Sequence, residues 1–413
     1  MRNVWRKRLV VGLLTLCLLT APVCADGGGQ VLYDESNGEQ LGELLREGQE
    51  AWPTMAVSAD SADLDVKAKG AVLMDQGTGR VLYEKDAHTH LPIASVTKVM
   101  TLLLVSEALE AGKIALTDPV TCSDTAAALG GSQIWLEPGE IMTVQELIKA
   151  AAVVSANDAC GALAEHLCGS QTAFVAQMNR RAAELGMKDT QFADCSGLDD
   201  TGYSSAYDVA LMSRELMTHP MIEEYTTIWM DSLRGGASQL VNTNKLLRHY
   251  KGATGLKTGT TNAAGHCLTA TARRENTSFI AVVLGCASTA DRWAGARTLL
   301  DYGFAGYETY TPSAQMVNPE PIRVVGGQQQ MVAVVPDDPA PLLLRKGTSG
   351  ELVSSVEVVE RVEAPVSAGQ TVGIWRLKIG EETVGEYPIR AVCDVPVTTL
   401  RWAYGLLMDA LLG

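Results

Sequence analysis

Ser95 and Lys98 are the pair of residues in this 413-residue chain whose spacing most directly suggests chemistry, because nowhere else does a lysine follow a serine by three positions. A serine hydroxyl is a weak nucleophile at neutral pH and needs a neighbouring base. Side chains three residues apart on a helix lie on one face, within reach of each other. Burial would lower the pKa of the lysine, so that its neutral amine could accept the serine proton. The spacing therefore predicts a serine nucleophile with a lysine base.

Two further polar motifs lie downstream. Ser155-Ala156-Asn157 falls in a turn between two expected helices, where it could offer a hydroxyl to a proton relay and an amide to a substrate carbonyl. Serine and asparagine are also common turn and cap residues, so the triplet alone is weak evidence. Lys257-Thr258-Gly259-Thr260 combines a cation and hydroxyls with a glycine that lets a substrate backbone approach closely. In isolation it is also compatible with an ordinary polar strand.

The three motifs occur in one order, and the combination is much more specific than each motif alone. Together they match the signature of class A β-lactamases and penicillin-binding proteins. Two further stretches narrow the match: Gly130-Gly131-Ser132-Gln133-Ile134-Trp135-Leu136-Glu137-Pro138-Gly139-Glu140 and Asp194-Cys195-Ser196-Gly197-Leu198. With them, the chain resembles the low-molecular-mass D-alanyl-D-alanine carboxypeptidases of the S11 serine peptidase family. The resemblance is close over residues 69–307. Ser232-Leu233-Arg234 and the segment 242–247 are similar to its Gram-positive, sporulation-associated branch.

The resemblance implies a role for each motif residue. Ser95 would be acylated by the penultimate D-alanine carbonyl of a peptidoglycan stem pentapeptide, Lys98 would be the general base, and Ser155 would belong to the proton relay. The residues implied to line or bind the substrate are Asn157, Lys257, Thr258, Gly259, Thr260 and Arg292. The backbone amides of Ser95 and Thr260 would form the oxyanion hole. An equally weighted alternative for Arg292 is a surface arginine. The reaction implies no cofactor, and penicillin would be a covalent inhibitor.

Other activities are compatible with parts of this pattern. A class A β-lactamase would need a glutamate in a Glu-x-x-Leu-Asn setting between the second and third motifs; none is found there, and Glu184 has the wrong neighbours. A transpeptidase is disfavoured because the chain is short and has no glycosyltransferase-like region. A non-catalytic peptidoglycan-binding protein would be expected to lose motif residues, and all three motifs are intact.

The elements that must position these residues can be predicted from pattern. Residues 71–75 and 80–84 flank a Gly-rich turn typical of a hairpin. A helix from Ser95 to near Gly112 is apolar almost all round and must be buried, with the nucleophile in its first turn at the positive end of the dipole. Thr143 and Glu146 form a capping box for a helix through Val154. Further elements are expected at residues 159–167 (helix) and at 266–272 and 278–284 (strands). The resemblance implies an α/β fold, a sheet flanked by helices with an inserted helical subdomain.

The N-terminus has a basic head, an apolar core at residues 9–19 and a small-residue cleavage site at 21–25. It predicts a signal peptide over residues 1–25; an uncleaved anchor is disfavoured because a span needs about 17–25 apolar residues. Its removal changes the formal charge from −15 to −19, because residues 1–25 hold four basic and no acidic residues. Such acidity makes nucleic acid an unsuitable partner. We expect export to the extracytoplasmic face of a bacterial membrane.

The rest of the chain divides by composition into a polar linker (26–65), a catalytic domain (66–310), a small all-β domain (311–396) and a C-terminal helix (397–413). Short β-type runs are expected at 322–325, 331–335, 352–361, 371–379 and 386–392. In the last helix Arg401, Gly405 and Asp409 form a narrow stripe on an otherwise apolar surface, which favours a helix lying in a membrane plane. Docking on the β domain or a partner chain is the alternative.

Seven cysteines remain after residue 25. An odd number cannot be a complete disulfide framework, and Cys160 and Cys168 would lie about 12 Å apart on one helix, too far to bridge. Without a Cys-x-x-Cys or His-Glu-x-x-His motif, we predict no metal site.

Overall fold

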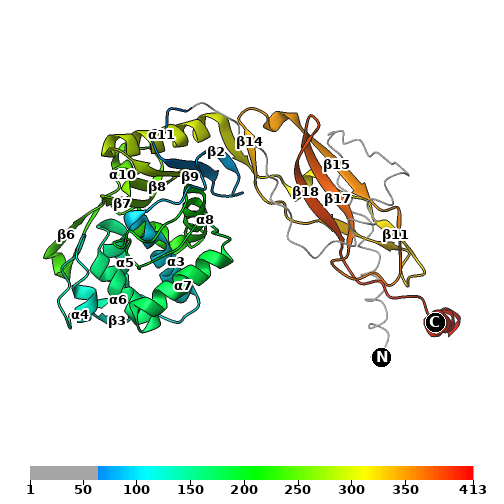
Figure 1. Cartoon of the computed structure of the whole chain (residues 1–413). Helices are drawn as coiled ribbons and strands as arrows, with labels where there is room; N and C mark the ends of the chain where they lie inside the picture. The colour runs from blue at the N-terminus through cyan, green and yellow to red at the C-terminus, as the bar shows by residue number, and fades with distance from the viewer. Residues whose placement is uncertain (1–63, 413) are drawn as a thin grey trace. The chain divides into compact units, whose positions relative to one another are not determined.

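The computed structural model describes residues 64–412. The predicted signal peptide and nearly all of the predicted linker lie outside the described residues. The described chain forms two compact units: a larger one from residues 64–313 and 339–351, and a smaller one from residues 314–338 and 352–412 (Figure 1).

The larger unit is built on a five-stranded antiparallel sheet with the order β2-β1-β9-β8-β7. The strands are β1 (Gly70–Asp75), β2 (Val81–Lys85), β7 (Ala253–Thr261), β8 (Gly265–Arg274) and β9 (Thr277–Cys286). The predicted hairpin is confirmed as β1 and β2, and the two later runs as β8 and β9. The sheet places the Lys-Thr-Gly motif on an edge strand, β7.

Both faces of this sheet are covered by helices, so alternate residues of one strand enter two different cores. Ala71 and Leu73 of β1 pack with Leu299 of α11 (Thr289–Gly306). Val72 and Met74 pack in the opposite core, to which α3 (Lys98–Glu110) and α8 (Ala206–Leu216) contribute. Figure 1 shows α11 on one side of the sheet and α3 and α8 on the other. The expected α/β fold is confirmed.

A helical region is inserted between β2 and β7, as the resemblance implied. It contains the helices α4 (Asp124–Ala127), α5 (Val144–Val153), α6 (Asn157–Cys168), α7 (Gln171–Glu184), α9 (Pro220–Thr226) and α10 (Leu246–His249), together with α3 and α8. Two small ribbons, β3 (Pro119–Thr121) with β4 (Ile141–Thr143) and β5 (Met230–Leu233) with β6 (Ser238–Val241), complete it. The predicted capping box at Thr143 and Glu146 is present at the start of α5.

The segment that carries Ser95 differs from the prediction. Ser95 lies in a 3-10 turn, η2 (Ala94–Thr97), and the α-helix begins only at Lys98. Ala94 has a positive φ of 48°, which turns the chain sharply before the helix. The serine therefore precedes the first turn of α3, although the side chains of Ser95 and Lys98 still face each other.

The smaller unit is an all-β domain followed by a helix. One sheet has the order β12-β11-β16 and the other β13-β18-β17-β15, and the second packs around the fully buried Trp375. The strands are β11 (Ile322–Val325), β12 (Met331–Val332), β13 (Val334–Pro336), β15 (Leu352–Val358), β16 (Arg361–Glu363), β17 (Thr371–Ile379) and β18 (Glu382–Ala391). The predicted run 331–335 is thus two strands, which belong to different sheets. In the predicted run 352–361, the strand ends at Val358.

The segment between β13 and β15 and the final helix complete the described chain. Residues 339–351 belong to the larger unit because β14 (Leu342–Arg345) pairs with β10 (Tyr307–Tyr310). The final helix, α12 (Leu400–Leu412), has no buried residue, so docking on the β domain is not observed. No helix within residues 64–412 is both long enough and apolar enough to span a bilayer.

Candidate active site

Lys98 lies at the centre of the site and is fully buried. Its Nζ donates to Ser95 Oγ at 2.9 Å, to Asn157 Oδ1 at 2.6 Å and to the backbone oxygen of Ser196 at 2.7 Å. Burial lowers the pKa of Lys98 below its ordinary value, and the charge of Asp194 opposes part of that effect. Burial thus favours the neutral amine, whose two N–H groups can serve Asn157 and Ser196 while its lone pair accepts the Ser95 proton.

The second motif forms the wall beside this lysine. Ser155 adopts a left-handed backbone with φ of 64°, and its buried Oγ has no hydrogen-bond partner among the described residues. Asn157 is the first residue of α6. Its side-chain Nδ2 donates to the backbone oxygen of Gly130 at 2.8 Å, and its backbone amide donates to the backbone oxygen of Ser132 at 2.7 Å. The amide side chain is therefore fixed on both sides, between Lys98 and the loop at residues 130–132.

The third motif closes on the nucleophile because Gly259 has no side chain. A Cβ at this position would lie 2.6 Å from the Ile93 carbonyl oxygen and 3.1 Å from the Ser95 amide nitrogen. Strand β7 can consequently lie directly against η2, which brings the backbone of Thr260 near that of Ser95. Two backbone amides in such a position are suited to stabilise a developing oxyanion.

Lys257 and Thr258 lie behind this contact on β7. Lys257 is buried, and its Nζ donates to the backbone oxygen of Thr258 at 2.8 Å. Its pKa is lowered well below the ordinary lysine value, first by burial and then by the charges of Lys98 and Arg292. Thr258 Oγ1 donates to Thr243 Oγ1 at 2.8 Å. Lys257 and Arg292 have no ion pair with a carboxylate among the described residues, so their charged forms are suited to an anionic ligand.

Arg292 reaches the same strand from α11. It is 7 % exposed, and its Nη1 lies 3.4 Å from the Gly259 carbonyl oxygen and 3.3 Å from Thr260 Oγ1. Burial lowers its pKa. The alternative that Arg292 is a surface residue is therefore wrong.

Comparison with known proteins identifies the family of this chain. Residues 54–288 match the profile of the family described as D-alanyl-D-alanine carboxypeptidase, Peptidase_S11. The chain belongs to the D-alanyl-D-alanine carboxypeptidase family. Residues 307–397 match the family described as penicillin-binding protein 5, C-terminal domain.

Members of the carboxypeptidase family resemble the chain over most of its length. It is 41% identical to the D-alanyl-D-alanine carboxypeptidase DacF of Bacillus subtilis, over 81% of this chain and 87% of that protein. The structure of penicillin-binding protein 5 from Haemophilus influenzae superposes with a TM-score of 0.73 at 30% identity, covering 82% of this chain and all of that one. Penicillin-binding protein D2 from Listeria monocytogenes, solved in an ampicillin-bound form, is 32% identical with a TM-score of 0.54, over 59% of this chain and 100% of that chain.

Two carboxylates that organise the site were not predicted as functional. Asp194 accepts hydrogen bonds from the amides of Ser196, Gly197, Leu198 and Asp199, and so shapes the loop whose Ser196 carbonyl binds Lys98. Asp158, which is fully buried, accepts from the amides of Ile134 and Leu136. An aspartate followed closely by serine and glycine is a turn signal, which would have indicated the first of these.

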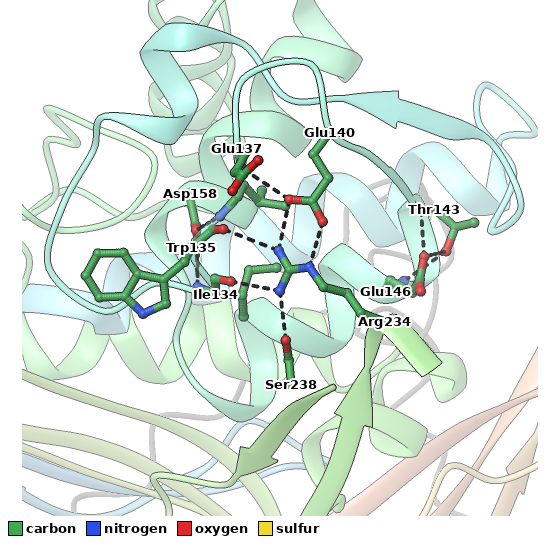
Figure 2. A network of polar contacts seen from close by, with 10 residues as sticks. Ile134, Trp135, Glu137, Glu140, Thr143, Glu146, Asp158, Arg234 and Ser238 are labelled. Atoms are coloured by element: carbon green, nitrogen blue, oxygen red, sulfur yellow. Dashed lines mark hydrogen bonds and ion pairs between the residues drawn. The ribbon is translucent and has the colours of Figure 1, made fainter. Parts of the chain in front are cut away.

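A charged network on the far side of the 130–136 loop was also missed. Arg234 donates to Glu140 through both Nε, at 2.6 Å, and Nη2, at 3.0 Å, and its Nη1 donates to the Ile134 carbonyl oxygen at 2.9 Å (Figure 2). The partners are 94 residues apart in sequence. No short motif could reveal such a pair.

Proposed function

We propose that this protein is a serine-type D-alanyl-D-alanine carboxypeptidase that removes the terminal D-alanine from peptidoglycan stem pentapeptides through an acyl-enzyme on Ser95. The observation that carries the proposal is the 2.9 Å contact between the buried Lys98 amine and the Ser95 hydroxyl. This contact supplies a base for the nucleophile in surroundings that disfavour a protonated lysine.

The reaction follows from these positions. Neutral Lys98 takes the Ser95 proton as Oγ bonds to the carbonyl carbon of the penultimate D-alanine. The negative charge on the carbonyl oxygen is stabilised by the amides of Ser95 and Thr260. The peptide C–N bond then breaks, and the leaving D-alanine amine receives a proton through Ser155, whose hydroxyl has no other partner within residues 64–412. Water attacks the resulting ester, and Ser95 regains its proton.

Substrate orientation would depend on Lys257 of β7 and Arg292 of α11. The C-terminal carboxylate of a D-Ala-D-Ala peptide would be held by Lys257, Thr258 and Arg292, and Asn157 would bind a backbone carbonyl of the donor. Because neither Lys257 nor Arg292 forms an ion pair in the part of the chain that the structure describes, a carboxylate placed between them would gain strong, weakly screened interactions. Penicillin carries a carboxylate and an acylating carbonyl, so it would occupy the same cleft. Because the glutamate of class A β-lactamases has no counterpart between the motifs, we expect slow deacylation and therefore inhibition.

The cellular setting is also part of the proposal. A cleaved signal peptide over residues 1–25 would export the enzyme to the outer face of a bacterial membrane, where stem peptides are found. The apolar, exposed surface of α12 would give it peripheral membrane contact, with Trp402 and Tyr404 at the interface. A role in sporulation rests on sequence similarity alone.

The test uses residues 26–413 purified as wild type and as Ser95→Ala. Wild type should release D-alanine from a peptide ending in D-Ala-D-Ala and be labelled by a fluorescent penicillin, and the variant should do neither. The proposal fails if wild type and Ser95→Ala behave alike in both assays.

A further inference from the structure

Trp135 combines two properties that rarely occur together. It is 76 % exposed, more than any other Phe, Tyr or Trp that the structure describes. Its backbone is left-handed, with φ of 57°, a conformation that is strained for a bulky residue. Exposure to solvent alone gives no reason for a strained backbone, so other contacts must maintain it.

Two charged side chains fix the backbone on both sides of Trp135. Asp158 accepts from the amides of Ile134 and Leu136, at 3.1 and 3.0 Å. Arg234 donates to the carbonyl oxygens of Ile134 and of Trp135 itself, at 2.9 and 3.4 Å. Figure 2 shows the indole directed away from the Arg234 guanidinium and free of the network that holds its backbone. The arrangement presents the indole to solvent from a backbone that is held on both sides.

The loop that carries Trp135 is continuous with the wall of the active site. Asn157 binds Gly130 and Ser132 of this loop, and Asp158, the next residue, binds the amides that flank Trp135. A Cβ on Gly131 would lie 2.6 Å from Asn157 Nδ2, so the loop and the wall are in direct contact. The loop that carries the indole therefore lies against the Asn157 side of the cleft.

We propose that Trp135 is a substrate-contact residue, which packs against the side chain that precedes D-Ala-D-Ala in the donor peptide and selects for a long, methylene-rich one. The inference rests on the proposed function. With the C-terminal carboxylate among Lys257 and Arg292 and the scissile carbonyl at Ser95, the earlier part of the peptide lies beyond the nucleophile, along the Asn157 wall. A flat indole can cover a methylene chain at little entropic cost while the polar end of that chain stays in water.

The experiment compares two substrates that differ only at this side chain: diacetyl-L-lysyl-D-Ala-D-Ala and acetyl-L-alanyl-D-Ala-D-Ala. kcat/KM for D-alanine release is measured for wild type, Trp135→Asn, Trp135→Phe and Ile141→Ala. Asparagine tolerates the left-handed backbone, so Trp135→Asn removes the indole without adding strain. Ile141 is 63 % exposed and lies outside the site, so Ile141→Ala controls for loss of exposed apolar surface.

We expect Trp135→Asn to lower the ratio of kcat/KM for the lysyl peptide to that for the alanyl peptide about tenfold, equivalent to about 1.4 kcal/mol. Trp135→Phe should retain the ratio within about threefold, and Ile141→Ala should match wild type. If Trp135→Asn lowers both rates equally or changes neither, the inference is wrong while the proposed function stands. If wild type releases D-alanine from neither peptide, the proposed function fails and the inference fails with it.

Discussion

Replacing Gly259 by alanine tests whether the contact between β7 and η2 assembles the oxyanion hole. The new Cβ would lie 2.6 Å from the Ile93 carbonyl oxygen, whereas ordinary contacts begin at 3.4 Å. The strand and the turn must therefore separate by about 0.8 Å, the difference between these distances. The backbone of Gly259 has no positive φ, so the effect of the added methyl is steric alone.

The separation moves the Thr260 amide away from the Ser95 amide, which lies 3.1 Å from the same added atom. A misplacement of about 1 Å in a reacting group can cost about 100-fold in rate, and losing one oxyanion donor costs about 100-fold to 1000-fold. We therefore expect the rate of acylation to fall about 100-fold, or about 2.7 kcal/mol. Overpacking should also lower the free energy of unfolding by about 1–3 kcal/mol.

The assay is the second-order rate constant for labelling by a fluorescent penicillin, measured at a temperature where circular dichroism shows both proteins folded. Gly350→Ala is the matched control, because a Cβ there would meet no atom within 4 Å. It should label at the wild-type rate. A folded Gly259→Ala that labels within about threefold of wild type would refute the reasoning, because the hole would then tolerate the separation.

Three further outcomes follow from burial in the site and core. Lys98→Met should lower the rate of penicillin acylation about 100-fold to 10,000-fold. In wild type this rate should rise with pH, with a midpoint below the ordinary lysine pKa of 10.5. A midpoint at or above 10.5 would contradict the base role. The pKa of Lys257 is lower in the folded state than in the unfolded state, so between these two pKa values the unfolded chain binds more protons and stability rises with pH. Lys257→Met should therefore have a higher melting temperature than wild type at pH 7, and the difference should shrink toward pH 10.5. A difference in melting temperature that does not change with pH would argue against this linkage. Exposed Cys393 should react with a thiol reagent at pH 8 in the native state, whereas Cys160, whose pKa burial raises to about 11, should react only after unfolding, as peptide mapping would show.

The sequence predicts what depends on local pattern. The hairpin of β1 and β2 follows from alternation and glycines, and the capping box at Thr143 and Glu146 from a four-residue motif. The motif residues at Ser95, Ser155 and Lys257 come from separate segments, and only the resemblance to a known family indicated that they meet. Their catalytic roles stay predictions.

What the sequence missed depends on contacts between distant segments. The 3-10 turn at Ser95 arises where Ala94 has a positive φ and Gly259 packs closely, and neither feature has a local signal. Burial of Arg292 likewise requires α11 and β7 to be placed together. In the smaller unit, the run 331–335 divides between two sheets because its first and last residues pair with different strands.

The carboxylates near Lys98 act on it through their charges alone, which limits how far they raise its pKa against the lowering by burial. A lysine in direct contact with a carboxylate would be held protonated, and could not accept the Ser95 proton. Asp194 and Asp158 are close enough for their charges to act on Lys98, yet neither forms an ion pair with it in the described chain. Their oxygens accept hydrogen bonds from loop amides instead. The same carboxylates therefore shape the loops around the cleft while Lys98 contacts only neutral oxygen atoms. Lys257 and Arg292 have no carboxylate partner in the described chain, and the substrate can provide one.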